Sequence, residues 1–296
     1  MPTLADISHL DCVGLTKYGE RQCRAMVQYV KEKGLLNSSM PVECDGEGIV
    51  IAGGGKYLSW AWVLCRRLRD LGCRLPVQVW YLGQVEMPDE ARVRFEVLGV
   101  ELVDAYVVMR SRPVRQMSGW ILKNYAVTNC PWERVLFLDA DCFPVKDPTS
   151  LLSIGTLFFH DVNNCRTSDW PYSYCGLELP EREWETGQFV VDKRSGWMGL
   201  RWTGWMNEDF DVWTKQAGLY GDKGTFELGF RVSGVPLVMG DAPEWAGYGI
   251  LHSYQGKPAF QHCMAVKRGE HGMFPWLTAL FREWEKEVAT VHSRAL

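Results

Sequence analysis

The stretch VLFLDADCFP, residues 135–144, decides the fold class, because four apolar residues lead directly into two carboxylates, Asp139 and Asp141. Such a run is typical of a buried strand in a parallel sheet, and ligands of open α/β sheets bind beyond the carboxyl ends of the strands. Carboxylates two residues apart in an extended chain point the same way and repel each other unless a cation lies between them. The pattern therefore predicts a cation site here. The alternative is a turn-capping Asp139 beside a solvated Asp141.

Strands and helices alternate on both sides of this stretch. Strands are expected at 48–54, 76–82, 100–105, 134–141, 155–161, 187–193, 235–240 and 258–263. Helices are expected at 16–34, 56–72, 88–99 and 119–130, with two or three more over 195–232. This order predicts a single α/β domain over 46–296, with a mixed, mostly parallel sheet flanked by helices, after an N-terminal helical arm over 1–45.

The composition bounds the function classes. A net charge of −4 over 296 residues argues against a general nucleic-acid-binding surface, which needs a basic face. Apolar runs stay below the roughly 18 residues of a membrane span, and the start of the chain lacks a secretory signal pattern. Ten cysteines are scattered without a CxxC pair, which favours free thiols in a reducing, cytoplasmic setting.

Three further motifs follow the paired aspartates in order: ETGQFVVDKRSGW from Glu185, GDKGTF from Gly221, and a late histidine, His262. With VLFLDADCFPVKDP, they resemble GT-A-fold (Rossmann-like) retaining glycosyltransferases, in particular the fungal α-1,3-mannosyltransferase family and, more distantly, glycogenin-type enzymes. The resemblance covers about residues 48–268. It implies transfer of a hexose from a nucleotide-diphospho-sugar, GDP-mannose or a UDP-hexose, to an acceptor hydroxyl with retention of configuration.

The resemblance also implies a metal and donor site. Its metal ligands would be Asp139, Asp141 and His262, holding Mn²⁺ or Mg²⁺, which suit oxygen-rich sites. Donor contacts would come from the loop IAGGGKY and from residues near the metal: Ala52, Gly53, Tyr57, Lys123, Asp139, Ala140 and Lys267, with Arg268 the alternative to Lys267. Each motif also has a structural explanation: a glycine-rich turn for the loop, a solvent-facing helix lysine for Lys123, and a structural histidine for His262.

The catalytic residues implied by the resemblance are Glu185, Gln188 and Asp222. Glu185 is a candidate nucleophile or oxocarbenium stabiliser, with a strand-edge glutamate as the structural alternative. Asp222 would hold sugar hydroxyls, although its place before a helix also fits an N-cap. The Trp- and Tyr-rich loop over 163–184 would cover the acceptor as a lid, with the aromatic rings of Trp170, Tyr172, Tyr174 and Trp184 stacking on it.

Other readings of the sequence stay open. The acceptor could be a glycan, a protein, a lipid-linked sugar or a modified DNA base of the kind some viruses use. A non-catalytic nucleotide-sugar-binding module would share the motifs, as would a Golgi-type lumenal domain with its anchor removed. A haloacid-dehalogenase phosphatase is disfavoured because several strands precede Asp139 and Phe143 follows the pair. A sugar-1-phosphate nucleotidyltransferase would need Arg and Leu-Pro beside its glycine-rich loop, which the GGGKY loop lacks.

Overall fold

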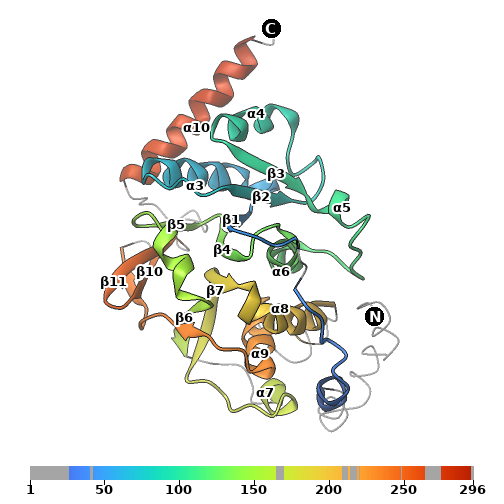
Figure 1. Ribbon diagram of the computed structural model, residues 1–296. Helices are drawn as coiled ribbons and strands as arrows, with labels where there is room; N and C mark the ends of the chain where they lie inside the picture. The colour runs from blue at the N-terminus through green and yellow to red at the C-terminus, as the bar shows by residue number, and fades with distance from the viewer. Residues whose placement is uncertain are drawn as a thin grey trace.

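A seven-stranded sheet forms the centre of the protein (Figure 1). The computed structural model describes residues 27–40, 43–164, 170–208, 213, 219, 221–247, 249–263 and 275–294. Along the sheet the strands follow the order β3-β2-β1-β4-β7-β6-β8. Their bounds are β1 Glu47–Ala52, β2 Val77–Tyr81, β3 Val100–Asp104, β4 Arg134–Asp139, β6 Leu157–Asn164, β7 Arg182–Asp192 and β8 Val238–Met239. Only β7 runs against its neighbours, so the predicted mixed, mostly parallel sheet is confirmed.

Helices cover both faces of this sheet, because its strands alternate apolar side chains between two cores. On β4, Leu136 and Leu138 join the core under α3 (Leu58–Asp70), α4 (Asp89–Val97) and α10 (Pro275–Arg294). Val135 and Phe137 join the opposite core, under α6 (Gly119–Asn129), α8 (Lys193–Glu208) and α9 (Lys223–Ser233). The remaining short helices are η2 Gly55–Tyr57, α5 Ala105–Val108, η3 Thr149–Ile154 and α7 Trp170–Tyr174. The strands and helices predicted around the central stretch are thus confirmed.

A second sheet, not predicted as such, completes the candidate-site edge. Its order is β5-β11-β10-β9, and its bounds are β5 Cys142–Pro144, β9 Glu244–Ala246, β10 Gly249–Tyr254 and β11 Lys257–His262. The strand β5 follows β4 almost directly and pairs antiparallel with β11, so that Cys142 faces His262. This pairing carries a C-terminal histidine to the end of β4.

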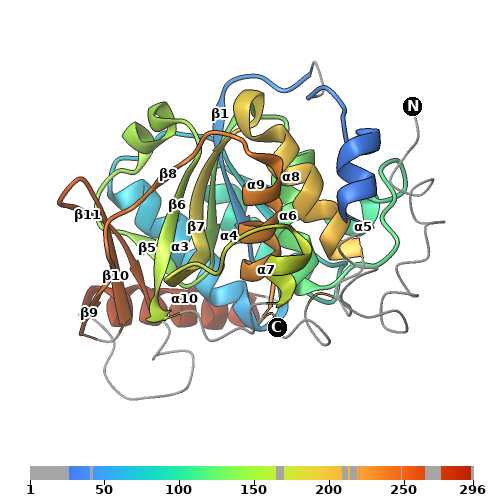
Figure 2. The same cartoon turned by 90° about the horizontal axis from the view of Figure 1, so that it is seen from below.

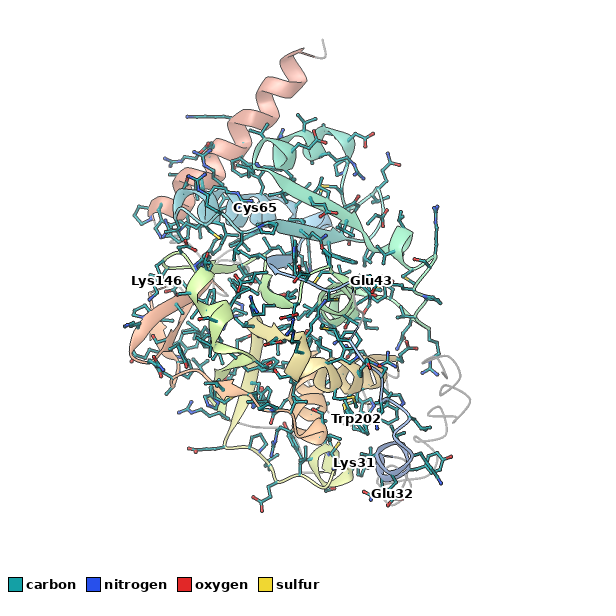
Figure 3. The ribbon with its side chains drawn as sticks, in the orientation of Figure 1. Lys31, Glu32, Glu43, Cys65, Lys146 and Trp202 are labelled. Atoms are coloured by element: carbon teal, nitrogen blue, oxygen red, sulfur yellow. The ribbon has the colours of Figure 1, made fainter. Side chains whose placement is uncertain are left out.

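The N-terminal arm packs against the second half of the chain. Residues 27–33 are helical, and the helix ends at Gly34, whose φ of 59° is the left-handed stop that the sequence predicts. Val27 and Val30 are buried in a cluster with Trp202 of α8, and Figures 2 and 3 show this helix beside α8. The rest of the predicted arm helix lies outside the described residues.

The described residues also bear on the cysteine and membrane predictions. Seven cysteines in them are free, and all but Cys175 are buried, which agrees with the predicted free thiols. None of the described helices is long and apolar enough to cross a membrane.

Candidate active site

A cleft of about 690 Å³ opens at the carboxyl ends of β1 and β4. This is the edge at which the sequence places the candidate site. It is lined by the following residues: Ala52, Gly53, Gly54, Lys56, Tyr57, Leu82, Glu86, Ser118, Gly119, Trp120, Leu122, Lys123, Asp139, Ala140, Asp141 and Asp222. The structure therefore gathers most of the predicted donor-contact residues in one cleft.

The glycine-rich loop after β1 forms one wall of this cleft. A Cβ atom on Gly53 would lie 2.4 Å from the Cβ of Ala61 on α3, and one on Gly54 would lie 2.8 Å from Glu86 and Tyr81. Only glycine fits so close to these neighbours, which supports the structural explanation of the motif. The loop nevertheless lines the cleft, where Tyr57 lies beside Lys56, whose Nζ is 5.0 Å from the Tyr57 ring centroid.

Lys123 links two of the predicted aspartates. Its Nζ lies 3.2 Å from Asp139 Oδ2 and 2.9 Å from Asp222 Oδ2, and it donates a 2.8 Å hydrogen bond to the carbonyl of Thr186. The side chain is buried, so the alternative of a solvent-facing lysine is wrong. Burial alone would lower the pKa of Lys123, but the charges of Asp139 and Asp222 outweigh it and raise the pKa well above its ordinary value. The lysine is therefore permanently charged.

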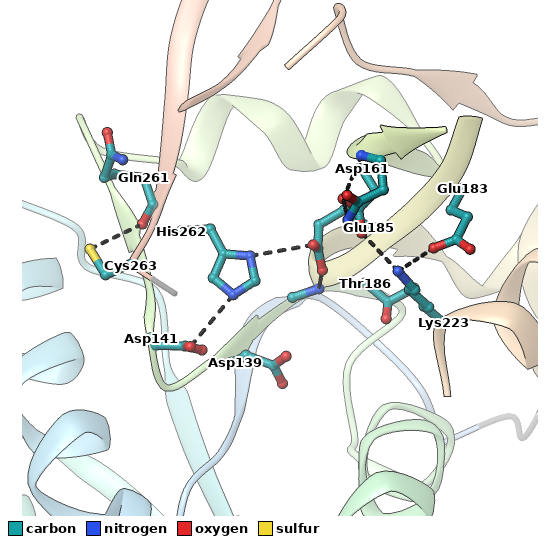
Figure 4. A network of polar contacts seen from close by, with 12 residues as sticks. Asp139, Asp141, Asp161, Glu183, Glu185, Thr186, Lys223, Gln261, His262 and Cys263 are labelled. Atoms are coloured by element: carbon teal, nitrogen blue, oxygen red, sulfur yellow. Dashed lines mark hydrogen bonds and ion pairs between the residues drawn. The ribbon is translucent and has the colours of Figure 1, made fainter. Parts of the chain in front are cut away.

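Asp222 precedes α9 but makes no side-chain capping bond to the helix. Its carboxylate points instead to Lys123, and Asp222 lines the cleft. The capping alternative is therefore wrong. Its neighbour Lys223 belongs to a different ion network, with Asp161 at 2.8 Å and with Glu183, drawn in Figure 4.

Asp141 and His262 meet at the inner end of the cleft. The carboxylate Oδ2 of Asp141 is 3.5 Å from His262 Nε2, and the backbone N–H of Cys263 donates to the Asp141 carbonyl at 2.9 Å. The β5–β11 ladder fixes this meeting. Ligand atoms of Asp141, Cys142 and His262 lie within 4.8 Å of one another. An oxygen and a nitrogen donor so placed fit a divalent cation, while Asp139 is turned toward Lys123 and stands outside this group.

Glu185 lies behind His262. Its Oε1 accepts a 2.7 Å hydrogen bond from the Gly187 N–H, and its Oε2 is 3.4 Å from His262 Nδ1, so the imidazole stands between two carboxylates (Figure 4). Burial would raise the pKa of Glu185, but the charge of His262 lowers it well below its ordinary range. Burial would likewise lower the pKa of His262, yet the neighbouring carboxylates raise it well above its ordinary value. A Cβ on Gly187 would meet Cys142 and His262, so this packing explains the glycine of ETGQ.

The described residues that line the cleft include neither Glu185 nor Gln188. Gln188 is fully buried, opposite Leu138 in the β4–β7 ladder, and its side-chain amide has no hydrogen-bond partner among the described residues. The two predicted catalytic residues of the ETGQ motif thus lie beneath the cleft surface, whereas Asp222 lies on it.

The remaining predictions concern the aromatic loop and the late basic pair. Tyr172, Tyr174 and Trp184 are buried. Tyr172 donates to Glu227 at 3.3 Å, and Trp184 packs on Phe158 with ring centroids 4.8 Å apart. These three rings belong to the core, so their predicted acceptor stacking is wrong. The side chain of Trp170 lies outside the described residues, as do Lys267 and Arg268.

Sequence reasoning missed two residues of this edge. Trp120, in the first turn of α6, lines the cleft with 52% of its surface exposed. His252 of β10 is fully buried, with its ring centroid 6.4 Å from that of His262, and burial lowers its pKa to about 4. The signal for Trp120 was its place directly after Gly119 and three residues before Lys123; His252 carried no local signal.

Comparisons with known proteins agree with the motifs. Residues 46–174 match the model of a family described as "Mannosyltransferase putative". The α-1,2-mannosyltransferase MNN24 of Candida albicans is 32% identical over 143 residues, which cover 45% of this chain and 20% of that protein. The α-1,2-mannosyltransferase MNN5 of Saccharomyces cerevisiae is 30% identical over 136 residues, covering 44% and 23%. The chain thus spans about a fifth of the length of these relatives.

Part of the chain resembles mannosyltransferases. The α-1,3 linkage of the predicted family does not appear in the names of these relatives, which are α-1,2 enzymes. Solved structures similar to the chain include the galactosyltransferase LgtC in complex with donor and acceptor sugar analogues (14% identity, TM-score 0.45, covering 67% of this chain and 74% of that one). Another is the glycosyltransferase GlyE of Streptococcus pneumoniae TIGR4 (14% identity, TM-score 0.42, covering 66% and 45%).

Proposed function

We propose that this chain is a metal-dependent mannosyltransferase, which moves a hexose from a nucleotide-diphospho-sugar to a hydroxyl of a glycan acceptor. The observation that carries the proposal is the convergence of Asp141, His262 and the Lys123-bound Asp139 at one end of a cleft large enough for a nucleotide-sugar. The names of the matched relatives favour mannose, and hence GDP-mannose, over UDP-hexoses.

Asp141 and His262 would hold the cation, Mn²⁺ or Mg²⁺, and Asp139 would join them by turning away from Lys123. When bound, the cation neutralises charge that develops on the leaving diphosphate. Lys123, whose charge is permanent and whose position is fixed by Thr186 and Asp222, supplies a second positive charge at the same end of the cleft. The nucleotide would lie along the glycine-rich loop, with its base near Tyr57.

On the acceptor side, Asp222 lines the cleft beside Lys123, and its carboxylate would hold sugar hydroxyls. Trp120 offers an exposed aromatic face to a sugar ring. Glu185 is separated from the cleft by His262, which favours front-face attack by the acceptor hydroxyl over a covalent adduct on Glu185. Both routes retain configuration.

A non-catalytic binding module is less consistent with this site, because both an oxygen and a nitrogen ligand are in place at the cleft end. A viral enzyme acting on modified DNA bases, the predicted alternative acceptor class, draws no support from the relatives. The cytoplasmic location stays a prediction.

The proposal is tested by measuring GDP and UDP release from GDP-mannose and UDP-hexoses, with mannose-containing oligosaccharides as acceptors. We expect GDP release that requires Mn²⁺ or Mg²⁺, stops in EDTA and increases with acceptor. Nucleotide-sugar binding without release under all of these conditions would establish the binding module instead. Equal release in EDTA would remove the metal from the mechanism.

A further inference from the structure

Three buried side chains converge behind the cleft: Glu185 of β7, His252 of β10 and His262 of β11. They are 7%, 0% and 5% exposed, and their ligand atoms lie within 4.8 Å of one another. The three strands that carry them belong to two different sheets. This group shares His262 with the group that contains Asp141 and Cys142. Its other two members, Glu185 and His252, are not among the described residues that line the cleft.

His252 is the residue that calls for an explanation. Neither of its ring nitrogens has a hydrogen-bond partner among the described residues, although the side chain is fully buried. A buried polar group without a partner is costly, so such groups are rare unless a water or an ion satisfies them. One face of its surroundings is apolar: the Phe159 ring stands edge-on at 5.7 Å between centroids. Its ionisable neighbours are Glu185, His262 and Asp161.

His262 serves both sides of this arrangement. Its Nε2 faces Asp141 at 3.5 Å, and its Nδ1 faces Glu185 at 3.4 Å. A neutral imidazole has one N–H and one lone pair, so it can offer only one nitrogen to a cation. If Nε2 binds a cation with Asp141, the Nδ1 N–H is directed at Glu185, as carboxylates commonly orient metal-binding histidines. If Nδ1 binds a cation with Glu185, the Nε2 N–H is directed at Asp141.

We propose that Glu185, His252 and His262 form a second cation site, which takes a divalent transition-metal ion such as Zn²⁺. Two imidazoles and one carboxylate are a donor set that Zn²⁺ prefers, whereas Mg²⁺ and Mn²⁺ prefer the oxygen ligands of the cleft. Because both sites need the lone pair of His262, an ion in this inner site excludes a His262-bound ion from the outer site. The proposal that this site binds an ion is independent of the proposed function. Only the expectation that such an ion inhibits sugar transfer, by excluding the cation from the cleft, rests on the proposed function.

The test is titration of the chelator-treated full chain with Zn²⁺ by calorimetry, and with Co²⁺ by its visible absorption. We expect His252→Ala to weaken Zn²⁺ binding by at least about a hundredfold, the upper end of the loss seen when even an outer partner of a metal ligand is removed. Glu185→Gln should weaken it similarly. His160→Ala is the matched control, because His160 pairs with Trp184 on the other face of the strand pair and should leave Zn²⁺ affinity unchanged. Asp139→Asn should also leave it unchanged.

Zn²⁺ affinity in His252→Ala equal to that of the wild type would overturn the proposal. So would a calorimetric site lost in Asp139→Asn but kept in Glu185→Gln, since that places the ion in the cleft. If His252→Ala does not fold, as judged by circular dichroism, His252→Gln and Glu185→Gln decide the question. Zn²⁺ should in addition compete with Mn²⁺ in binding titrations of the wild type. Intact Zn²⁺ binding by a protein that releases no nucleotide would refute the proposed function and leave this site standing.

Discussion

Two carboxylate pairs at the same sheet edge are neutralised in different ways. Asp139 and Asp222 share the ammonium group of Lys123, whereas Asp141 and Glu185 share the imidazole of His262. A buried lysine with a raised pKa keeps its charge at every working pH, so the cation of the first pair is permanent. An imidazole can give up its proton and bind a metal ion instead, so the cation of the second pair can be exchanged. The first pair should therefore depend on Lys123 for its stability, and the second on what His262 binds.

The largest effect on stability should follow from removing Lys123, the cation shared by Asp139 and Asp222. Lys123→Met leaves Asp139 and Asp222 without their buried cation and should lower the free energy of unfolding by about 3–5 kcal/mol, measured by urea denaturation. Lys56→Met removes the same charge from an exposed lysine of the cleft and should change stability by less than about 0.5 kcal/mol. Equal stability of the two variants would contradict the structural role of Lys123.

Substitution in the second pair, Asp141 and Glu185, should lower activity more than stability. Asp141→Ala removes a proposed cation ligand and should lower kcat/KM for Mn²⁺-dependent transfer by about 100- to 1000-fold, the range for losing one group that stabilises a developing charge. Its melting temperature should stay closer to the wild type than that of Lys123→Met. Asp89→Ala, an exposed site on α4, is the control. Undiminished Mn²⁺-dependent turnover in Asp141→Ala would remove this pair from the chemistry.

A buried carboxylate outside both pairs, Glu227, sharpens the contrast, because its neighbouring cation does not keep it ionised. Burial raises the pKa of Glu227 from its ordinary 4.5 to about 7, against the lowering effect of Arg231, 2.9 Å away, and of Tyr172. The folded protein then binds a proton up to about pH 7 that the unfolded chain releases near pH 4.5. The contribution of Glu227 to the free energy of unfolding should therefore fall by about 3 kcal/mol as the pH rises through this window. His252, whose pKa is lowered to about 4, contributes a rise of similar size up to about pH 6.5, so the effect of Glu227 is measured as a difference between variants.

The stability difference between the wild type and Glu227→Gln should fall as the pH rises from 4.5 to 7, whereas the difference between the wild type and Glu90→Gln, at an exposed position, should stay flat. The measurement is urea denaturation at half-unit pH steps. A wild-type-minus-Glu227→Gln difference that is flat or rises across this window would show that Glu227 is ionised in the folded protein.

The smallest effect concerns the exposed ring at the cleft. Trp120→Ala should raise the KM for acceptor or donor by about fivefold, since one aromatic face contributes on the order of 1 kcal/mol to a stacked contact. Trp120→Phe should recover part of the loss. Trp245→Ala removes an even more exposed tryptophan from β9, outside the cleft, and should leave KM as it was. Equal changes of KM in Trp120→Ala and Trp245→Ala would contradict a substrate contact of Trp120.

The first half of the fold could be predicted because its signals are local. The run before Asp139 is apolar over one strand, and glycines at 72 and 99 follow the ends of α3 and α4. The burial of Lys123 could not be predicted, because its partners lie far away in the sequence: the carbonyl of Thr186 on β7 and the carboxylate of Asp222 before α9. The sequence predicts Tyr172 and Trp184 in an acceptor lid, but the structure buries both rings. A segment rich in aromatic residues has the same composition in a lid as in a core, so the sequence alone does not distinguish the two.

The second half was harder because its contacts join distant parts of the chain. The metal-ligand role predicted for Asp141 and His262 rests on the family resemblance and stays a prediction; the structure places the two side chains 3.5 Å apart. The strand β5 has only three residues directly after the predicted strand over 134–141, and neither β5 nor β10 is among the predicted strands. His252 was missed for that reason: its partners are fixed by the β10–β11 ladder, in which it faces Phe260.

The pairing of β5 with β11 also bears on the order in which the site forms during synthesis. Domains tend to form from the N-terminus as synthesis proceeds, and pairings between distant segments form late. Asp139, Asp141 and Lys123 leave the ribosome well before β11, and the pairing of β11 with β5 is what places His262 beside Asp141. A chain stalled before β11 would have an acidic cleft without this histidine nearby. Binding of the proposed cation is therefore expected to come late in maturation, after β11 has paired with β5.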